Sequence, residues 1–129
     1  MQAVTRQDRR KQSNNGSDPN KNVCALRIAQ HLGVADKVRY LHTIPDLKRA
    51  ASHRFSVRSR ATALGVKRGR KTTVGSMRKH CESQGAIAYI VWVPGHVLLL
   101  TGYGETVIDS DKRERDSRKV LGVWGLYPK

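Results

Sequence analysis

Two apolar segments that follow each other directly constrain this chain more than any other feature. AIAYIVWV at 86–93 and HVLLLTGY at 96–103 consist mainly of aliphatic, β-branched and aromatic residues, and the turn-forming pair Pro94-Gly95 separates them. Short runs of this kind, bounded by turn residues, are typical of buried strands joined in a hairpin. Two more strands are expected after them: TVID, which follows a tight turn at Gly104-Glu105, and VLGVWGLYP at 120–128. We therefore predict an antiparallel sheet at the C-terminal end.

The N-terminal half of the chain has a different hydrophobic period. Apolar residues at positions 23, 26, 28, 29 and 32 recur at nearly helical spacing, and Gly33 follows them. This pattern predicts a helix over 23–32, with Cys24 in its first turn. The polar residues 1–17 bury no apolar area, so we expect a flexible arm followed by one domain over 18–129.

Three further helices are expected between this helix and the strands. They are a short one over 37–41, one after the turn at 44–46, and one from the N-cap pair Thr72-Thr73 to about Ser83, before Gly85. Helices first and antiparallel strands afterwards define the α+β class, in which the N-terminal helices pack on a C-terminal antiparallel β-sheet.

The charge of the chain indicates a polyanionic partner. The formal net charge is +15 and the pI is about 10.6. Residues 48–79 contain no Asp or Glu, and we expect a basic insertion without regular structure around 48–72. Two interpretations stay open: a solvated surface, and a patch that contacts nucleic acid without base specificity or an acidic host protein. The residues of this patch would be Arg54, Arg58, Arg60, Lys67, Arg68, Arg70 and Lys71.

Several classes of protein and site are not expected. No apolar run approaches the roughly 18 residues of a membrane helix. The first residues, MQAVTRQDRR, contain no apolar segment of an export signal, so we expect a cytoplasmic location. Cys24 and Cys81 lie far apart and match no zinc spacing, which predicts two free thiols, no metal and no cofactor.

Three residues have the types and order that thiol catalysis requires. A cysteine near a helix N-terminus has its pKa lowered by unpaired N–H groups, and catalysis also needs an imidazole and a third polar group that orients it. Cys24 is the candidate nucleophile and His96, at the start of a strand, is the candidate base. Asp109 or Asp111 ends the neighbouring strand. The choice between the two depends on strand register, and we favour Asp109.

These residues resemble those of the papain-like cysteine peptidase superfamily. A helix-borne cysteine followed by GH, an aliphatic run, GY and V-x-D is most similar to the small peptidase domains that cleave bacteriocin leader peptides. The resemblance implies a papain-like fold, a Cys24–His96–Asp109 triad, a peptide or protein substrate, and a polar oxyanion residue before the cysteine.

The oxyanion position departs from the pattern of that family, which usually has Gln there. Asp18 lies about at this position, but a carboxylate would repel an oxyanion, so Asn20 or Asn22 is the better candidate. The charge and the absence of an export signal resemble those of small phage-encoded proteins, which implies the host cytoplasm or the virion as location.

Cys81 and His80 form a rival pair of thiol and imidazole. Adjacent helix residues point about 100° apart, so these two cannot act on each other. We expect Cys81 to be buried.

Overall fold

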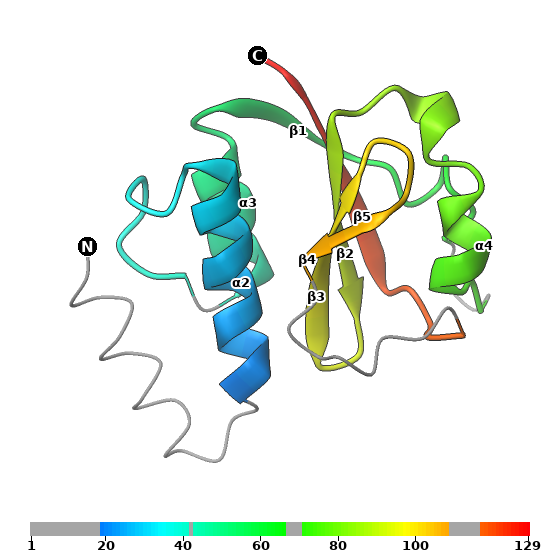
Figure 1. Cartoon of the computed structure of the whole chain (residues 1–129), viewed down its shortest axis with the longest axis horizontal. Helices are drawn as coiled ribbons and strands as arrows, with labels where there is room; N and C mark the ends of the chain where they lie inside the picture. The colour runs from blue at the N-terminus through cyan, green and yellow to red at the C-terminus, as the bar shows by residue number, and fades with distance from the viewer. Residues whose placement is uncertain (1–18, 42, 67–70, 109–116) are drawn as a thin grey trace.

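The computed structural model describes residues 19–41, 43–66, 71–108 and 117–129, and of 19–24 the backbone alone. The elements follow one another as α2 (Pro19–Leu32), α3 (Ile44–Ala51), β1 (Phe55–Ser59), α4 (Val74–Arg78), the 3-10 helix η1 (Glu82–Gln84), β2 (Ala88–Val93), β3 (His96–Thr101), β4 (Thr106–Ile108) and β5 (Gly122–Pro128) (Figure 1). The strands form one antiparallel sheet in the order β1-β5-β2-β3-β4. The predicted α+β class, with helices packed on an antiparallel sheet, is confirmed.

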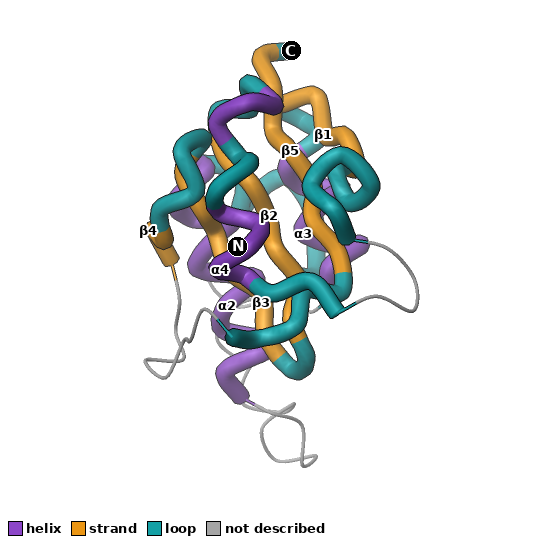
Figure 2. The backbone as a smooth tube through the Cα atoms, turned by 90° about the vertical axis from the view of Figure 1, so that its right-hand side faces the viewer, coloured by secondary structure: helices purple, strands orange, loops and turns teal. Residues whose placement is uncertain are grey.

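Helices cover both faces of this sheet. α2 and α3 lie on one face and α4 lies on the other, as the two views in Figures 1 and 2 show. Ile28 of α2 belongs to the same buried cluster as Leu99 of β3. Met77 of α4 belongs to a second cluster with Leu98, the neighbour of Leu99. Successive side chains of a strand point to opposite faces, so the sheet separates the core into two layers.

The strands β2, β3 and β4 form the predicted meander. Val93 and His96 are paired across the Pro94-Gly95 turn, where Gly95 adopts φ +73. β4 then returns along β3, with Ile108 opposite Leu99. The last strand lies beside β2, not beside β4, so that it joins the meander to the edge strand β1.

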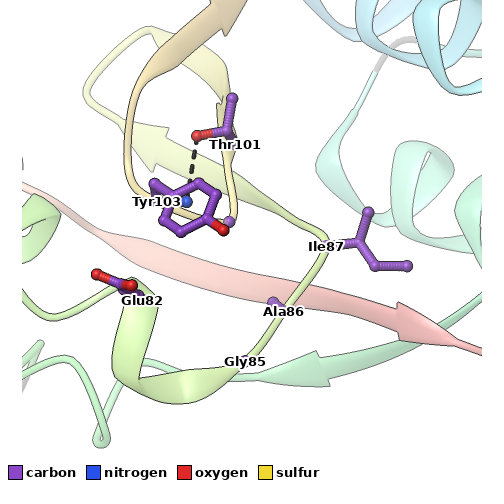
Figure 3. A pocket seen from close by; sticks show the side chains of 7 residues that line it. Glu82, Gly85, Ala86, Ile87, Thr101 and Tyr103 are labelled. Atoms are coloured by element: carbon purple, nitrogen blue, oxygen red, sulfur yellow. Dashed lines mark hydrogen bonds between the residues drawn. The ribbon is translucent and has the colours of Figure 1, made fainter.

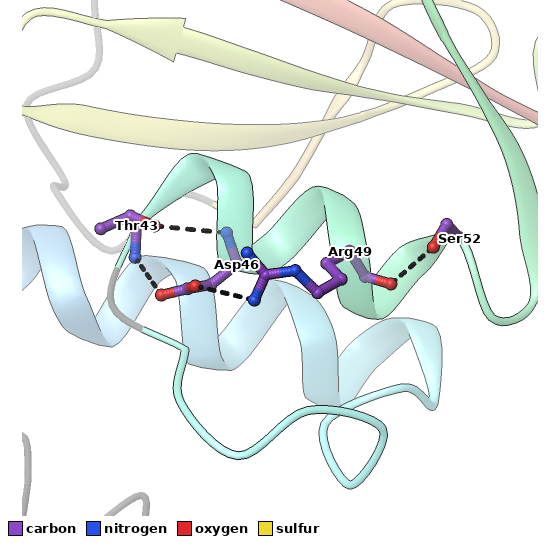
Figure 4. A network of polar contacts seen from close by, with 4 residues as sticks. All are labelled: Thr43, Asp46, Arg49 and Ser52. Carbon is purple, nitrogen blue, oxygen red and sulfur yellow. Dashed lines mark hydrogen bonds and ion pairs between the residues drawn. The ribbon is translucent and has the colours of Figure 1, made fainter.

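α3 begins with a complete capping box (Figure 4). The Thr43 hydroxyl accepts a hydrogen bond from the Asp46 N–H, and the Asp46 carboxylate accepts one from the Thr43 N–H. Pro45 lies in the first turn, where its missing N–H costs no helical bond. The turn that the sequence predicts at 44–46 is therefore already the first turn of the helix.

The segment 37–41 forms turns and bends and no helix. It is five residues long and has a single fully buried side chain, Leu41. The cost of nucleating a helix is therefore not recovered by packing.

The basic segment contains a strand that we had not expected. Phe55 and Val57 pack against the cluster under α3, whereas Arg58 between Val57 and Ser59 is exposed. These residues form β1, so the segment that we predicted to be an insertion without regular structure contains a strand.

The predicted helix 72–83 is divided in two. α4 starts after the N-cap Thr73, whose hydroxyl accepts from the Ser76 N–H, but it ends at Arg78. A turn and η1 follow, and Gly85 closes η1 with φ +71. The Tyr89 hydroxyl donates to the Cys81 carbonyl at this break.

No helix within the described ranges is long and apolar enough to cross a bilayer.

Candidate active site

The elements that carry or directly precede the predicted triad, α2, β3 and β4, contact one another. Leu32, the last residue of α2, lines a groove together with Leu99 and Thr101 from the second half of β3. α2 and β3 thus run side by side in the same direction, and their first residues lie at the same end of the molecule (Figure 1). β4 runs antiparallel to β3, so it ends toward that same end, and it also contacts α2.

Cys24 lies further inside its helix than the sequence indicates. α2 begins at Pro19, which makes Cys24 the sixth residue of the helix, in the second turn. Only the first four N–H groups of a helix lack an intrahelical partner. The Cys24 N–H is therefore part of the helical ladder and is not one of the unpaired N–H groups at the helix terminus. Asn20 and Asn22 belong to the first turn of α2, and Asp18 lies outside the described residues.

His96 is the first residue of β3 and is almost completely buried, with 3% of its surface exposed. It also has an interaction partner within the structure. Val97 and Leu99 pack in the cluster under α2, so alternation directs His96 to the same face as Leu98, the face of α4. The His96 ring and α2 therefore lie on opposite sides of the sheet, and the two can come into contact only at the end of the sheet, beside the hairpin turn.

Both candidates for the third member of the triad, Asp109 and Asp111, lie outside the described residues. β4 ends at Ile108, the residue before Asp109, and Ile108 is opposite Leu99.

Cys81 is buried, as predicted, and its surroundings make it unreactive. Its side chain has no exposed surface, and its Sγ lies 3.6 Å from the Met77 carbonyl, to which it donates. Burial raises the pKa of the Cys81 thiol to about 11, although the nearby Arg78 charge opposes the shift. Because the thiolate is the nucleophile, this cysteine has no catalytic potential at neutral pH.

The described members of the predicted basic patch divide between two places, one beside α2 and one around Tyr127. Arg54 turns toward α2, where its Nη1 donates to the Leu32 carbonyl at 2.8 Å. Arg60 donates from Nε to the Tyr127 hydroxyl at 2.6 Å, and the Arg58 guanidinium lies 5.9 Å from the centre of the same ring. Lys71 is exposed, and Lys67, Arg68 and Arg70 lie outside the described residues. Sequence reasoning missed Tyr127 as the centre of this cluster, although the alternation in FSVRS could have revealed the strand beside it.

A cavity of about 540 Å³ opens at the opposite end of the sheet from His96 (Figure 3). Glu82, Gly85, Ala86, Ile87, Thr101, Gly102 and Tyr103 line it. The Thr101 hydroxyl already accepts hydrogen bonds from the N–H groups of Tyr103 and Glu105. This lining contains neither a thiol nor an imidazole, so it offers no nucleophile–base pair. Among the residues that the structure describes, no group of three or more His, Cys, Asp or Glu is arranged to hold a metal ion.

No model of a known protein family, no curated protein and no solved structure matches this chain. The likeness to papain-like peptidases therefore rests on the residues of this sequence.

Proposed function

We propose that this protein is a thiol hydrolase that cleaves a peptide or isopeptide bond, with Cys24 as nucleophile, His96 as general base and then acid, and Asp109 as the residue that orients His96. One observation supports this proposal above the others: the first halves of α2 and β3 lie toward the same end of the sheet, and β4 returns along β3 toward that end as far as Ile108, opposite Leu99. These are the positions that carry or directly precede the three residues.

The reaction proceeds in two halves. His96 takes the proton of the Cys24 thiol, and the thiolate attacks the carbonyl carbon of the scissile bond. The C–N bond breaks as His96 returns that proton to the leaving amine, which leaves an acyl-thioester on Cys24. A water molecule then attacks the thioester carbonyl and transfers a proton to His96. When the C–S bond breaks, the acid product departs and the proton returns to Cys24.

Because α2 begins at Pro19, the proposed activation of Cys24 depends more on His96 than on the helix terminus. Since the Cys24 N–H belongs to the helical ladder, it is not available to stabilise an oxyanion, and a side chain must do so. Residues four apart lie on the same helix face, whereas residues two apart are separated by about 200°. Asn20 is therefore the favoured oxyanion residue, and Asn22 is not.

The test is alkylation of the protein by iodoacetamide at mildly acidic pH, with the modified residue located by mass spectrometry. We expect Cys24 alone to react, because in the proposed pair His96 takes its proton. At this pH an ordinary thiol carries almost no thiolate, and the buried Cys81 carries even less. The rate at Cys24 should fall at least about tenfold in His96→Gln.

Cys81→Ala is the matched control and should leave the alkylation rate of Cys24 unchanged. If Cys24 reacts no faster than a free cysteine, or if His96→Gln does not slow it, the hydrolase proposal fails. A binding function of the basic segment then remains.

A further inference from the structure

We propose that the outer edge of β1 is a docking site for an extended acidic peptide, which joins the sheet as an additional strand. The inference goes beyond the proposed hydrolase and does not depend on it. It rests on the backbone groups of β1 that point away from β5 and on the charge around them.

The hydrogen bonds between β1 and β5 show which residues of β1 face its neighbour. The Arg60 N–H donates to the Val123 carbonyl at 2.9 Å, and the register from Phe55↔Pro128 to Ser59↔Trp124 continues to this pair. In an antiparallel ladder every second residue pair exchanges such bonds. Arg60, Arg58 and Ser56 therefore direct their N–H and C=O groups toward β5.

The alternate residues of β1 direct their backbone groups away from the sheet. These positions are occupied by Phe55, Val57 and Ser59, and within the described residues β1 has only β5 as a partner strand. The Ser59 carbonyl accepts a hydrogen bond from the Arg60 side chain at 3.1 Å, so the groups open to a new strand are those of Phe55 and Val57 and the Ser59 N–H. Ser59 is exposed, and Phe55 and Val57 are partly exposed. A row of alternating donors and acceptors along an open edge is a template for another strand.

The charge around this edge selects an acidic partner. Arg58 is exposed, and its Nε lies 3.5 Å from the Ser56 hydroxyl on the same face. Asp46 is the only acidic residue in 43–66, and it is engaged in the α3 capping box and with Arg49. No carboxylate in this stretch neutralises the edge, so an acidic segment gains Coulomb energy there.

A peptide fits this edge better than a nucleic acid does. A phosphodiester offers acceptors only, whereas a peptide strand satisfies both the N–H and the C=O group of Val57 and also the N–H of Ser59. The nearby aromatic rings are also occupied: Lys48 Nζ lies 4.6 Å from the centre of the Trp124 ring, and the Arg60 guanidinium lies 4.9 Å from that of Tyr127. These contacts leave less of each ring available for base stacking.

The two faces of β1 predict the pattern of the ligand. Side chains of the added strand alternate between the face of Arg58 and the face of Val57. We therefore expect acidic residues to alternate with apolar ones over the length of β1.

The experiment measures binding of a fluorescent peptide of about eight residues, with alternating Glu and Val, to the Cys24→Ala protein, which cannot cleave it. Two further peptides carry N-methyl groups on one or the other alternate set of residues. Strand addition predicts that one N-methylated peptide loses at least about tenfold in affinity, whereas the other binds like the parent. Equal binding of the two N-methylated peptides overturns the proposal.

Variants of the protein test the charge. Arg58→Glu should weaken binding of the parent peptide, and Arg58→Lys should restore most of it. Lys79→Glu is the matched control, because it makes the same change of charge near the opposite edge of the sheet. Its neighbour Arg78 contacts Gly104 and Thr106 there. This variant should leave binding unchanged. An equal loss in Lys79→Glu, or binding of a single-stranded oligonucleotide in place of the peptide, contradicts the proposal.

Discussion

At the scale of single residues, the two cysteines lie in different elements. Cys81 follows α4 and has no exposed surface, and Cys24 lies in the second turn of α2. The burial of Cys81 was predictable from its place in an apolar helical pattern. The place of Cys24 in the second turn was not, because the polar residues before Val23 give no helical signal.

The raised pKa of Cys81 predicts a specific loss of stability at alkaline pH. The folded protein keeps the thiol proton up to about pH 11, whereas the unfolded chain releases it near 9.0. The resulting stabilisation is complete below pH 9 and is lost as the pH rises toward 11. Between pH 8 and pH 10, denaturant unfolding of the wild type should lose about 1 kcal/mol more than that of Cys81→Ala. Identical losses in both proteins would show that Cys81 ionises as easily when folded.

At the scale of elements, local chemistry decides where α3 begins, whereas β1 depends on a partner strand that is distant in the sequence. The cap of α3 can be recognised in the sequence, because Thr43, Pro45 and Asp46 have the order of a capping box. The sequence did not indicate β1, because the many Arg and Lys residues of this segment suggested a loop and only Phe55 and Val57 show the spacing of a strand. The strand becomes stable only through its pairing with β5, which is distant in the sequence.

The capping box predicts the stability of α3. Thr43→Ala removes the acceptor for the Asp46 N–H and should lower the free energy of unfolding by about 1 kcal/mol, measured by urea denaturation. Thr43→Ser keeps the hydroxyl and should retain most of the stability. A destabilisation by Thr43→Ser as large as that by Thr43→Ala would mean that the methyl group, and not the cap, matters.

At the scale of the whole molecule, the order of periodicities predicted the α+β class but not the arrangement of strands. The meander of β2, β3 and β4 follows from short turns, which hold neighbours in sequence together. The position of β5 beside β2 depends on contacts between distant segments, which no local pattern encodes. The same limit applies to the site. The residue types alone were enough to propose Cys24 and His96 as site residues, but the face of the sheet on which His96 lies follows only from the register of β3.

The central claim is that the His96 ring reaches the Cys24 thiol around the end of the sheet. A bifunctional alkylating reagent whose two electrophilic carbons flank a single carbonyl tests this contact directly, because it joins only groups within a few ångströms of each other. Our account predicts, by mass spectrometry, one bridge between the peptides that carry Cys24 and His96, absent in His96→Gln. Alkylation of Cys24 with no bridge to His96 would contradict it.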